Sequence, residues 1–164
     1  MVIREATSAD IPLIKELAEK IWPEAYHGII SDAQIQYMLH LIYSEEALHA
    51  QMSTGARFIF AQHEGIPVGF ASFSKKSDTE PQTFRLHKLY VLPRQHAQGI
   101  GSFLLDHLIL ESKKAGATLL ELNVNKFNPA KKFYNRKDFT ILREEVLDIG
   151  GGYVMDDYVM IKTL

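Results

Sequence analysis

The chain has 164 residues, of which 46% are hydrophobic and 23% are charged, and its formal net charge is -2. This composition is typical of a globular domain, and it argues against a disordered chain and against a basic protein that binds nucleic acid through its charge. The absence of cysteine excludes disulfides, a thiolate nucleophile and cysteine-bound metal.

We expect one domain over residues 1–164, because the sequence holds no internal repeat, low-complexity block or linker rich in Pro, Gly and Ser. The first residues lack the apolar region of a signal peptide, and no apolar run approaches the roughly 20 residues of a membrane helix. We therefore expect a cytoplasmic protein that has neither a membrane nor nucleic acid as its partner.

The first half of the chain combines helical spacing of apolar residues, serines suited to helix N-caps, and short apolar-aromatic runs. These patterns predict, in order, a strand over Met1–Thr7, helices over Ala9–Glu19, Ser31–Leu41 and Ser44–Thr54, and a hairpin of Arg57–His63 and Pro67–Lys75.

The second half alternates strands and helices before it ends in two strands. The predicted order is a strand over Phe84–Val91, a helix over Gly99–Ala115, a strand over Leu119–Val124, a short helix over Pro129–Lys137, and strands over Thr140–Ile149 and Tyr153–Lys162. Together the two halves predict an α/β protein with a mixed sheet that carries helices on its faces.

A glycine-bearing loop joins the strand that ends at Val91 to the following helix. Small residues at 97, 99 and 101 let backbone amides approach a ligand closely, and the helix presents free N–H groups at its start. These features predict an anion site with Arg94 at its rim. The loop lacks the third glycine of a dinucleotide-binding motif and the Gly-Lys-Ser/Thr of a P-loop. On its own it is equally consistent with glycines that only ease helix packing.

A second motif follows the strand Leu119–Val124, with Asn128 before a proline and Tyr134 six residues later. Strand, Gly-x-Gly loop, helix, strand, Asn-containing loop and Tyr-bearing helix, in this order, resemble the GCN5-related N-acetyltransferase (GNAT) superfamily. The resemblance follows the element order of the whole chain and is strongest over Leu86–Phe139. It implies a mostly antiparallel sheet with a splayed parallel pair and helices on both faces.

Three phrases resemble a narrower group, the bacterial polyamine acetyltransferases of the PaiA type. They are Lys88–Pro93, Leu122–Lys126 and Asp148–Tyr158. This resemblance implies acetyl-CoA as co-substrate and a small cationic amine, such as spermidine or spermine, as acceptor. Other acceptors (a protein N-terminus, an amino acid or an aminated drug) and a non-catalytic acyl-CoA-binding sensor stay open as alternatives. A homodimer is also left open.

The resemblance implies a cofactor site built from three segments. The strand end Leu89, Tyr90 and Val91 would pair with the pantetheine arm, and Asn128 would anchor that arm from the other side. Asn128 also suits the N-cap of the helix beginning at Pro129. The pyrophosphate would bind the loop residues His96, Ala97, Gln98, Gly99, Ile100, Gly101 and Ser102.

Three residues depart from the family pattern. His96 stands where Arg or Gln is usual, Ala97 replaces a common Gly, and Asp138 stands in place of a Gly. We expect the His96 change to weaken one phosphate contact or make it pH-dependent. Asp138 tolerates the left-handed conformation of a helix exit, so we expect that turn to persist.

Tyr134 is the expected catalytic residue, as a general acid that protonates the leaving thiolate and also contacts the cofactor. The alternative is that Tyr134 has no catalytic role and is only one apolar side chain of a short helix. Because the chain has no cysteine, we expect the amine to attack the thioester directly in a ternary complex. The scattered histidines lack metal-ligand spacing, and no metal is expected.

The acceptor site and the general base are less sharply defined by the sequence. Trp22, Glu24 and Tyr26, after the first predicted helix, form an aromatic and acidic cluster suited to a cationic amine. Asp157 belongs to an acidic pair near the last strand. Glu121 is the candidate base because strand alternation places it on the face of Asn123; its alternative is a salt-bridged strand residue.

Overall fold

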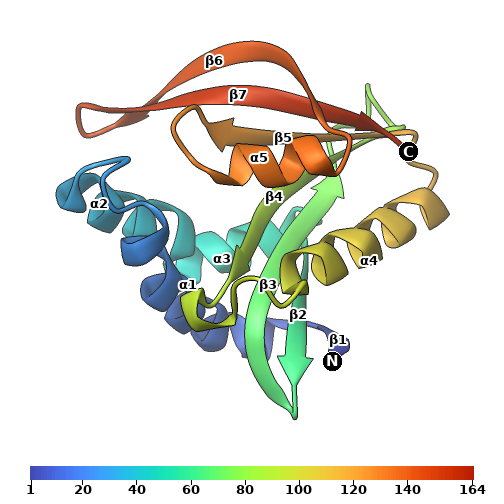
Figure 1. Cartoon of the computed structure of the whole chain (residues 1–164), viewed down its shortest axis with the longest axis horizontal. Helices are drawn as coiled ribbons and strands as arrows, with labels where there is room; N and C mark the ends of the chain where they lie inside the picture. The colour runs from blue at the N-terminus through green and yellow to red at the C-terminus, as the bar shows by residue number, and fades with distance from the viewer.

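The computed structural model describes residues 1–164, whose seven strands form one sheet in the order β1-β2-β3-β4-β5-β7-β6 (Figure 1). Only β4 and β5 run parallel to each other; all other neighbouring pairs are antiparallel. The strands are β1 (Val2–Glu5), β2 (Arg57–His63), β3 (Ile66–Lys75), β4 (Thr83–Val91), β5 (Leu119–Asn125), β6 (Thr140–Gly150) and β7 (Tyr153–Thr163). The predicted mixed sheet is confirmed.

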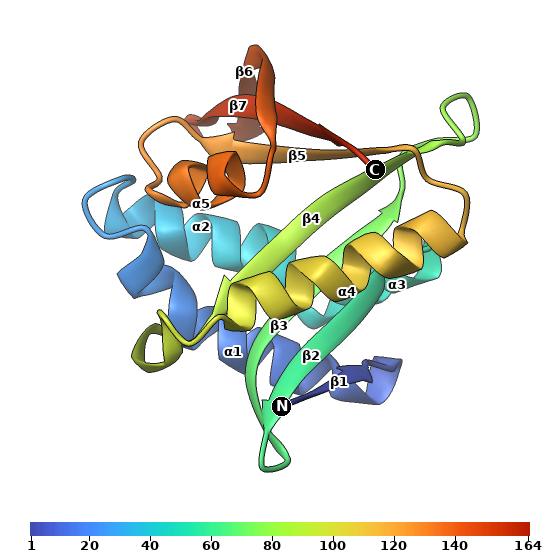
Figure 2. The same ribbon diagram turned by 45° about the vertical axis from the view of Figure 1, so that its right-hand side comes forward.

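Five α-helices cover the two faces of the sheet (Figure 2). Helices α1–α3 pack on one face, and α4 and α5 on the other. The helices are α1 (Ile11–Ala25), α2 (Asp32–Tyr43), α3 (Glu45–Ser53), α4 (Ile100–Lys114) and α5 (Ala130–Arg136), with short 3-10 turns at Ser8–Asp10 and Pro93–Gln95. None of them combines the length and apolar character that a membrane crossing needs.

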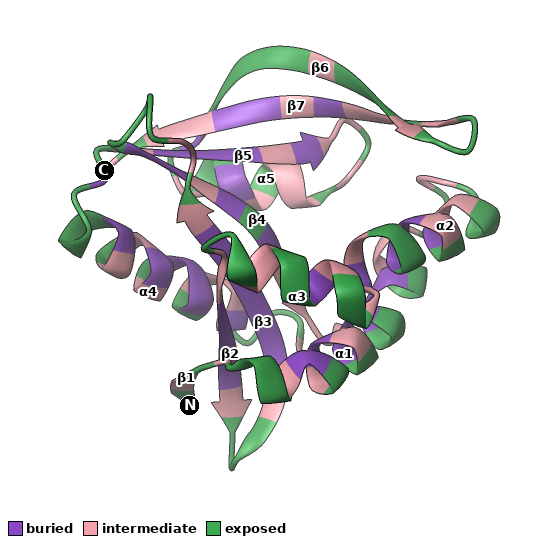
Figure 3. Cartoon of the chain, turned by 180° about the vertical axis from the view of Figure 1, so that it is seen from behind, coloured by how far each residue is buried: buried purple, intermediate pink, exposed green.

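Strand alternation divides the hydrophobic residues between two cores. Along β2, Phe58 and Phe60 pack with the core of α1–α3, whereas Ile59 and Ala61 pack with the core under α4. Figure 3 shows buried residues concentrated on the central strands and the inner sides of the helices, while the edge strand β6 is mostly exposed. The central strands are therefore held from both sides.

Helix α1 continues past its predicted end at Glu19 and reaches Ala25. The apolar stripe explains the extension, because Ile21 and Trp22 are almost completely buried and keep the helix against the sheet despite Pro23 in its last turns. Trp22 and Glu24 thus lie on the helix, and only Tyr26 follows it.

Strands β4 and β5 separate halfway along their length, as the family resemblance implied. Residues 83–86 of β4 pair with residues 119–122 of β5, but β4 continues to Val91 and β5 to Asn125 without further pairing to each other. On the other side of β4, Phe73 pairs with Leu86 and Ser72 with Lys88, so His87 is an extra residue in a β-bulge. The bulge and the end of pairing coincide, and together they open the sheet.

We predict that Gly69→Ala destabilises the fold by about 1–3 kcal/mol. Gly69 lies on β3 opposite Val91, and an added Cβ would lie 2.8 Å from the Tyr90 carbonyl oxygen and 3.3 Å from the Val91 Cα. Urea unfolding of the variant and the native protein measures the difference. Gly101→Ala is the control, because its Cβ would meet the Phe133 ring at an ordinary 3.6 Å; equal stability of all three proteins would contradict the close packing of β3 on β4.

Candidate active site

The loop after β4 presents a row of unpaired backbone amides. The first hydrogen bond of α4 runs from the Phe103 N–H to the Gly99 carbonyl at 2.9 Å, and the N–H groups from Ala97 to Ser102 have no acceptor within the chain. Free amides at a helix N-terminus, reinforced by the helix dipole, bind anions. The loop thus has the free amides that the predicted anion site requires, and the site itself stays a prediction.

Two residues of this loop adopt the left-handed backbone conformation. Gly99, the N-cap of α4, has a φ of 75°, which glycine adopts without steric cost. Ala97 has a φ of 66°, which costs a non-glycine residue about 1–2 kcal/mol. The Ala97 departure from the family pattern therefore keeps the turn but introduces strain. The His96 ring lies 3.0 Å from the Val91 carbonyl oxygen, through Nε2, and ties the loop to the end of β4.

A cavity of about 700 Å³ runs from this loop to the splayed strands. Glu24, Tyr26 and Arg136 are also in its wall, and the loop and the strand end of β4 face Asn128 and Tyr134 across it. Of the residues predicted to bind the cofactor, only Gln98 does not line the cavity; the others are Leu89, Tyr90, Val91, His96, Ala97, Gly99, Ile100, Gly101, Ser102, Asn128 and Tyr134.

Tyr134 lies on α5 with only 8% of its surface exposed. Its ring makes edge contacts with Phe133 and Phe139, at centroid distances of 5.2 and 5.6 Å. Burial raises the pKa of the Tyr134 phenol, and the nearby Tyr26 phenol raises it further. The hydroxyl is therefore protonated at neutral pH and available as a proton donor.

The ends of α5 hold Tyr134 in place. Helix α5 begins at Ala130 with Pro129 as its N-cap, one residue later than the capping pattern predicts, and the Asn128 side chain accepts a hydrogen bond from the Ala130 N–H at 2.9 Å just before it. Asp138 has a φ of 65°, the left-handed conformation expected at the helix exit, and turns the chain so that Phe139 is buried against Tyr134. Both turns depend on short polar side chains that tolerate them.

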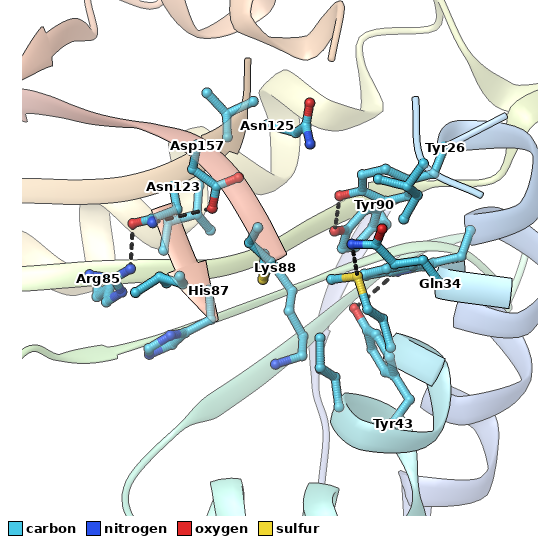
Figure 4. A pocket seen from close by; sticks show the side chains of 18 residues that line it. Tyr26, Gln34, Tyr43, Arg85, His87, Lys88, Tyr90, Asn123, Asn125 and Asp157 are labelled. Atoms are coloured by element: carbon cyan, nitrogen blue, oxygen red, sulfur yellow. Dashed lines mark hydrogen bonds between the residues drawn. The ribbon is translucent and has the colours of Figure 1, made fainter. Parts of the chain in front are cut away.

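A second cavity, of about 250 Å³, lies on the α1–α3 side of the splayed strands (Figure 4). The two cavities meet at the splayed strands, because residues of β4 and β5 line both of them. The shared residues are Tyr26, Leu86, His87, Lys88, Tyr90 and Asn123. The Tyr26 and Tyr90 hydroxyls are hydrogen-bonded at 2.9 Å, and the Trp22 ring packs on Tyr26 at 4.5 Å. Of the predicted acceptor residues, Trp22 lines the smaller cavity, Glu24 the larger one, and Tyr26 both.

Two buried charges line the smaller cavity. Lys88 is 8% exposed, donates a hydrogen bond to the Gln51 side chain at 2.6 Å, and faces the rings of Tyr43 and Phe58. Burial lowers the pKa of Lys88 to about 8. Asp157 is 1% exposed, and burial raises the pKa of its carboxyl group. The cavity therefore carries charges of both signs in an apolar setting.

Glu121 has a different setting from the one that a general base requires. It is 2% exposed and forms ion pairs with Lys76 at 3.0 Å and with Arg85 at 2.7 Å. It lines neither cavity. Glu121 is thus a salt-bridged strand residue, which was the alternative to its role as general base.

Several residues around the site were not singled out by sequence patterns. Lys88 could have been noticed, because strand alternation places its charge on an apolar face of its strand. No short-range pattern marks the others, which reach the cavities from separate elements: Gln34, Arg85, Asn125 and Arg136. Asp157 was noted in the sequence only as one of an acidic pair, and its burial in the cavity wall was not predicted.

The model of the acetyltransferase (GNAT) domain family matches residues 27–154. The chain belongs to the GNAT family. An uncharacterized N-acetyltransferase of Mycobacterium tuberculosis is 31% identical over 105 residues, which cover 63% of this chain and 65% of that protein. The matched part thus spans less than two thirds of the mycobacterial relative. The uncharacterized N-acetyltransferase YuaI of Bacillus subtilis is 28% identical over 100% of this chain and 98% of its own.

Solved structures share the GNAT fold along nearly the whole chain. A GCN5-related N-acetyltransferase from Rhodopseudomonas palustris superposes with a TM-score of 0.84 at 22% identity, covering 99% of this chain and 95% of that one. The PaiA N-acetyltransferase from Thermoplasma acidophilum, solved in complex with coenzyme A, gives 0.79 at 24% identity, covering 99% and 98%. These likenesses establish the fold.

Proposed function

We propose that this GNAT protein transfers the acetyl group of acetyl-CoA to a primary amine by direct attack in a ternary complex. The observation that carries this proposal is the 700 Å³ cavity, which joins the free amides of residues 97–102 to the gap between β4 and β5 and to Tyr134. A simple anion site would require only the loop amides, and not the part of the cavity that extends to the gap and to Tyr134.

The cavity has the parts that an acyl-CoA thioester needs. The pyrophosphate would accept hydrogen bonds from the amides of the loop, with the positive charge of Arg136 in the same wall. The peptide-like pantetheine arm would lie in the gap beyond Leu86, where β4 has no strand partner on its β5 side. The Thermoplasma PaiA N-acetyltransferase was solved in complex with coenzyme A, which supports a coenzyme A thioester as the ligand of this chain.

Two groups at the gap would act on the thioester, one on its carbonyl oxygen and one on its sulfur. An unpaired backbone amide of β4 would donate to the oxyanion that forms on the thioester carbonyl, a contact worth about 2.7–4 kcal/mol in other acyl transfers. Tyr134 would protonate the departing sulfur. The apolar surroundings that raise the pKa of Tyr134 keep its hydroxyl protonated, and they also raise the basicity of a thiolate leaving beside it. The raised phenol pKa opposes the proton transfer, and the raised thiolate basicity favours it.

For the acceptor we propose a small cationic amine of the polyamine class. Aromatic faces of Trp22 and Tyr26 and the carboxylates of Glu24 and Asp157 line the route to the gap. The buried Lys88 ammonium also lines the smaller cavity and repels further positive charge there. We therefore expect a polyamine to insert only one terminal ammonium, and its other charged groups to lie toward the exposed Glu24.

We predict that spermidine and spermine are acetylated with a higher kcat/KM than amino acids or short peptides. Release of coenzyme A measured with a thiol reagent tests this prediction, and the chain adds no background because it has no cysteine. A preference for peptides or amino acids would contradict the polyamine proposal and leave acetyl transfer standing. Binding of acetyl-CoA without acetylation of any amine would contradict acetyl transfer itself.

We predict that Tyr134→Phe lowers kcat at least about tenfold while the affinity for acetyl-CoA stays within a factor of about two, because the variant loses only a proton donor. Binding is measured by calorimetry and turnover by release of coenzyme A. Tyr158→Phe is the control, since it removes a phenol hydroxyl that lines neither cavity. Unchanged turnover of Tyr134→Phe would remove the general-acid assignment.

A further inference from the structure

Asp157 holds a carboxylate oxygen that nothing in the protein satisfies. On β7 it lies between Asn125 of β5 and Glu145 of β6 in the strand register, and only 1% of the residue is exposed. Its Oδ2 accepts a 3.3 Å hydrogen bond from the Asn123 side chain, whereas its Oδ1 is buried and has no hydrogen-bond partner. Figure 4 shows this carboxylate beside Asn123 at the wall of the smaller cavity.

The charged groups around Asp157 leave this oxygen unpaired. Arg85 of β4 is held by Glu121 at 2.7 Å and also bonds Asn123, while Lys88 of β4 donates to Gln51 of α3. Glu145 of β6 and Asp156 are negative neighbours that add repulsion to the cost of burial. The remaining titratable groups of the cavity wall are His87 of β4 and the phenols Tyr26, Tyr43 and Tyr90, and none is paired with Asp157.

A buried carboxylate oxygen without a donor is costly, and native proteins rarely leave one except where it has a catalytic role or binds a water or an ion. A cationic N–H donor is the partner that best compensates a buried carboxylate, because it provides both charge and a hydrogen bond. The smaller cavity is where such a donor can reach Asp157, and it opens at β4 on the gap proposed for the thioester.

We propose that Asp157 binds the ammonium group of the acceptor amine in the smaller cavity and takes one proton from it before attack. This inference rests on the proposed acetyl transfer and names a residue for a step that Glu121 does not serve. The Asn123 side chain acts as a positioning residue, since it donates to Glu145 at 2.7 Å and to Oδ2 of Asp157 at 3.3 Å and leaves Oδ1 without a donor.

The proton balance of the step is complete. One N–H bond of the ammonium breaks, and its proton moves to Asp157 Oδ1 while the electron pair stays on nitrogen. The nitrogen forms the new bond to the acetyl carbon, the carbon–sulfur bond breaks, and the sulfur receives a proton from Tyr134. The second nitrogen proton returns to the Tyr134 oxygen, and Asp157 releases the first proton to water.

Asp157→Asn tests the assignment with spermidine as the acceptor. We expect kcat/KM for spermidine to fall at least about 100-fold, the range for loss of a general base, while acetyl-CoA affinity stays within about twofold. Glu144→Gln is the control, since it removes a negative charge from an exposed side chain that lines neither cavity and should leave the rate unchanged.

The pH profile separates a proton-accepting role from a structural one. In the native protein the activity should fall at low pH as the Asp157 carboxylate is protonated, and burial moves this limb above the ordinary carboxyl range. In Asp157→Asn that limb should disappear, and kcat/KM should instead rise about tenfold per pH unit toward the pKa of the free amine near 10. Asp157→Glu should restore the acid limb.

A normal rate and pH profile in folded Asp157→Asn would overturn the inference and leave the proposed function intact. Failure of the native protein to bind acetyl-CoA or to acetylate any amine would overturn both. If Asp157→Asn does not fold, as judged by circular dichroism, the native profile and Asp157→Glu decide: a native profile without an acid limb above the ordinary carboxyl range would contradict the assignment.

Discussion

The pairing between β4 and β5 ends halfway along the strands, and this break fixes the position of the gap and of the two cavities that meet there. Pairing stops after Leu86 and Leu122, and the bulge at His87 turns β4 away at the same point. A strand in a sheet interior normally has hydrogen-bonding partners on both sides, and buried backbone groups without partners are costly. The end of pairing therefore leaves backbone groups of β4 without a strand partner in the middle of the sheet, and we propose that an extended, peptide-like ligand binds them.

The elements around the gap place polar groups on both sides of the splayed strands. On the α4 side, the helix N-terminus and the loop offer amides, and α5 brings Tyr134. On the other side, α2 and the β6–β7 hairpin close over the smaller cavity. Two hydrogen bonds join them, from the Tyr37 hydroxyl to the Ile149 carbonyl at 2.6 Å and from the Gln34 side chain to the Val154 carbonyl at 2.9 Å. This closure shields Asp157 from water. A carboxylate shielded from water is a stronger base than one exposed to it.

Local patterns predicted the strands, the helices and the anion-site loop, because each depends on short-range signals; the cofactor role of that loop came from the resemblance to the family. Gly99 and the small residues beside it indicate free amides, and Asn128 followed by proline indicates a helix start whatever the fold. The end of α1 was predicted too early, since Pro23 is a common terminator and only the burial of Trp22 against the sheet overrides it.

The roles of the acidic residues could not be predicted in the same way. Glu121 is neutralised by Lys76, which lies in the loop before β4, and by Arg85, and these contacts depend on the register of β4 on β5. The unpaired oxygen of Asp157 likewise depends on what β5 and β6 place beside β7. Alternation can place a charge on a face, but only the pairing of distant strands decides whether that charge has a partner.

We propose that acetyl-CoA occupies the gap between β4 and β5 with its pyrophosphate on the loop before α4. Titration of ¹⁵N-labelled protein with acetyl-CoA, followed through backbone amide chemical shifts, tests this placement. We expect the largest changes at residues 97–102 and 87–91, and little change in β1 and β2. Saturable binding that leaves both of these segments unshifted would contradict it.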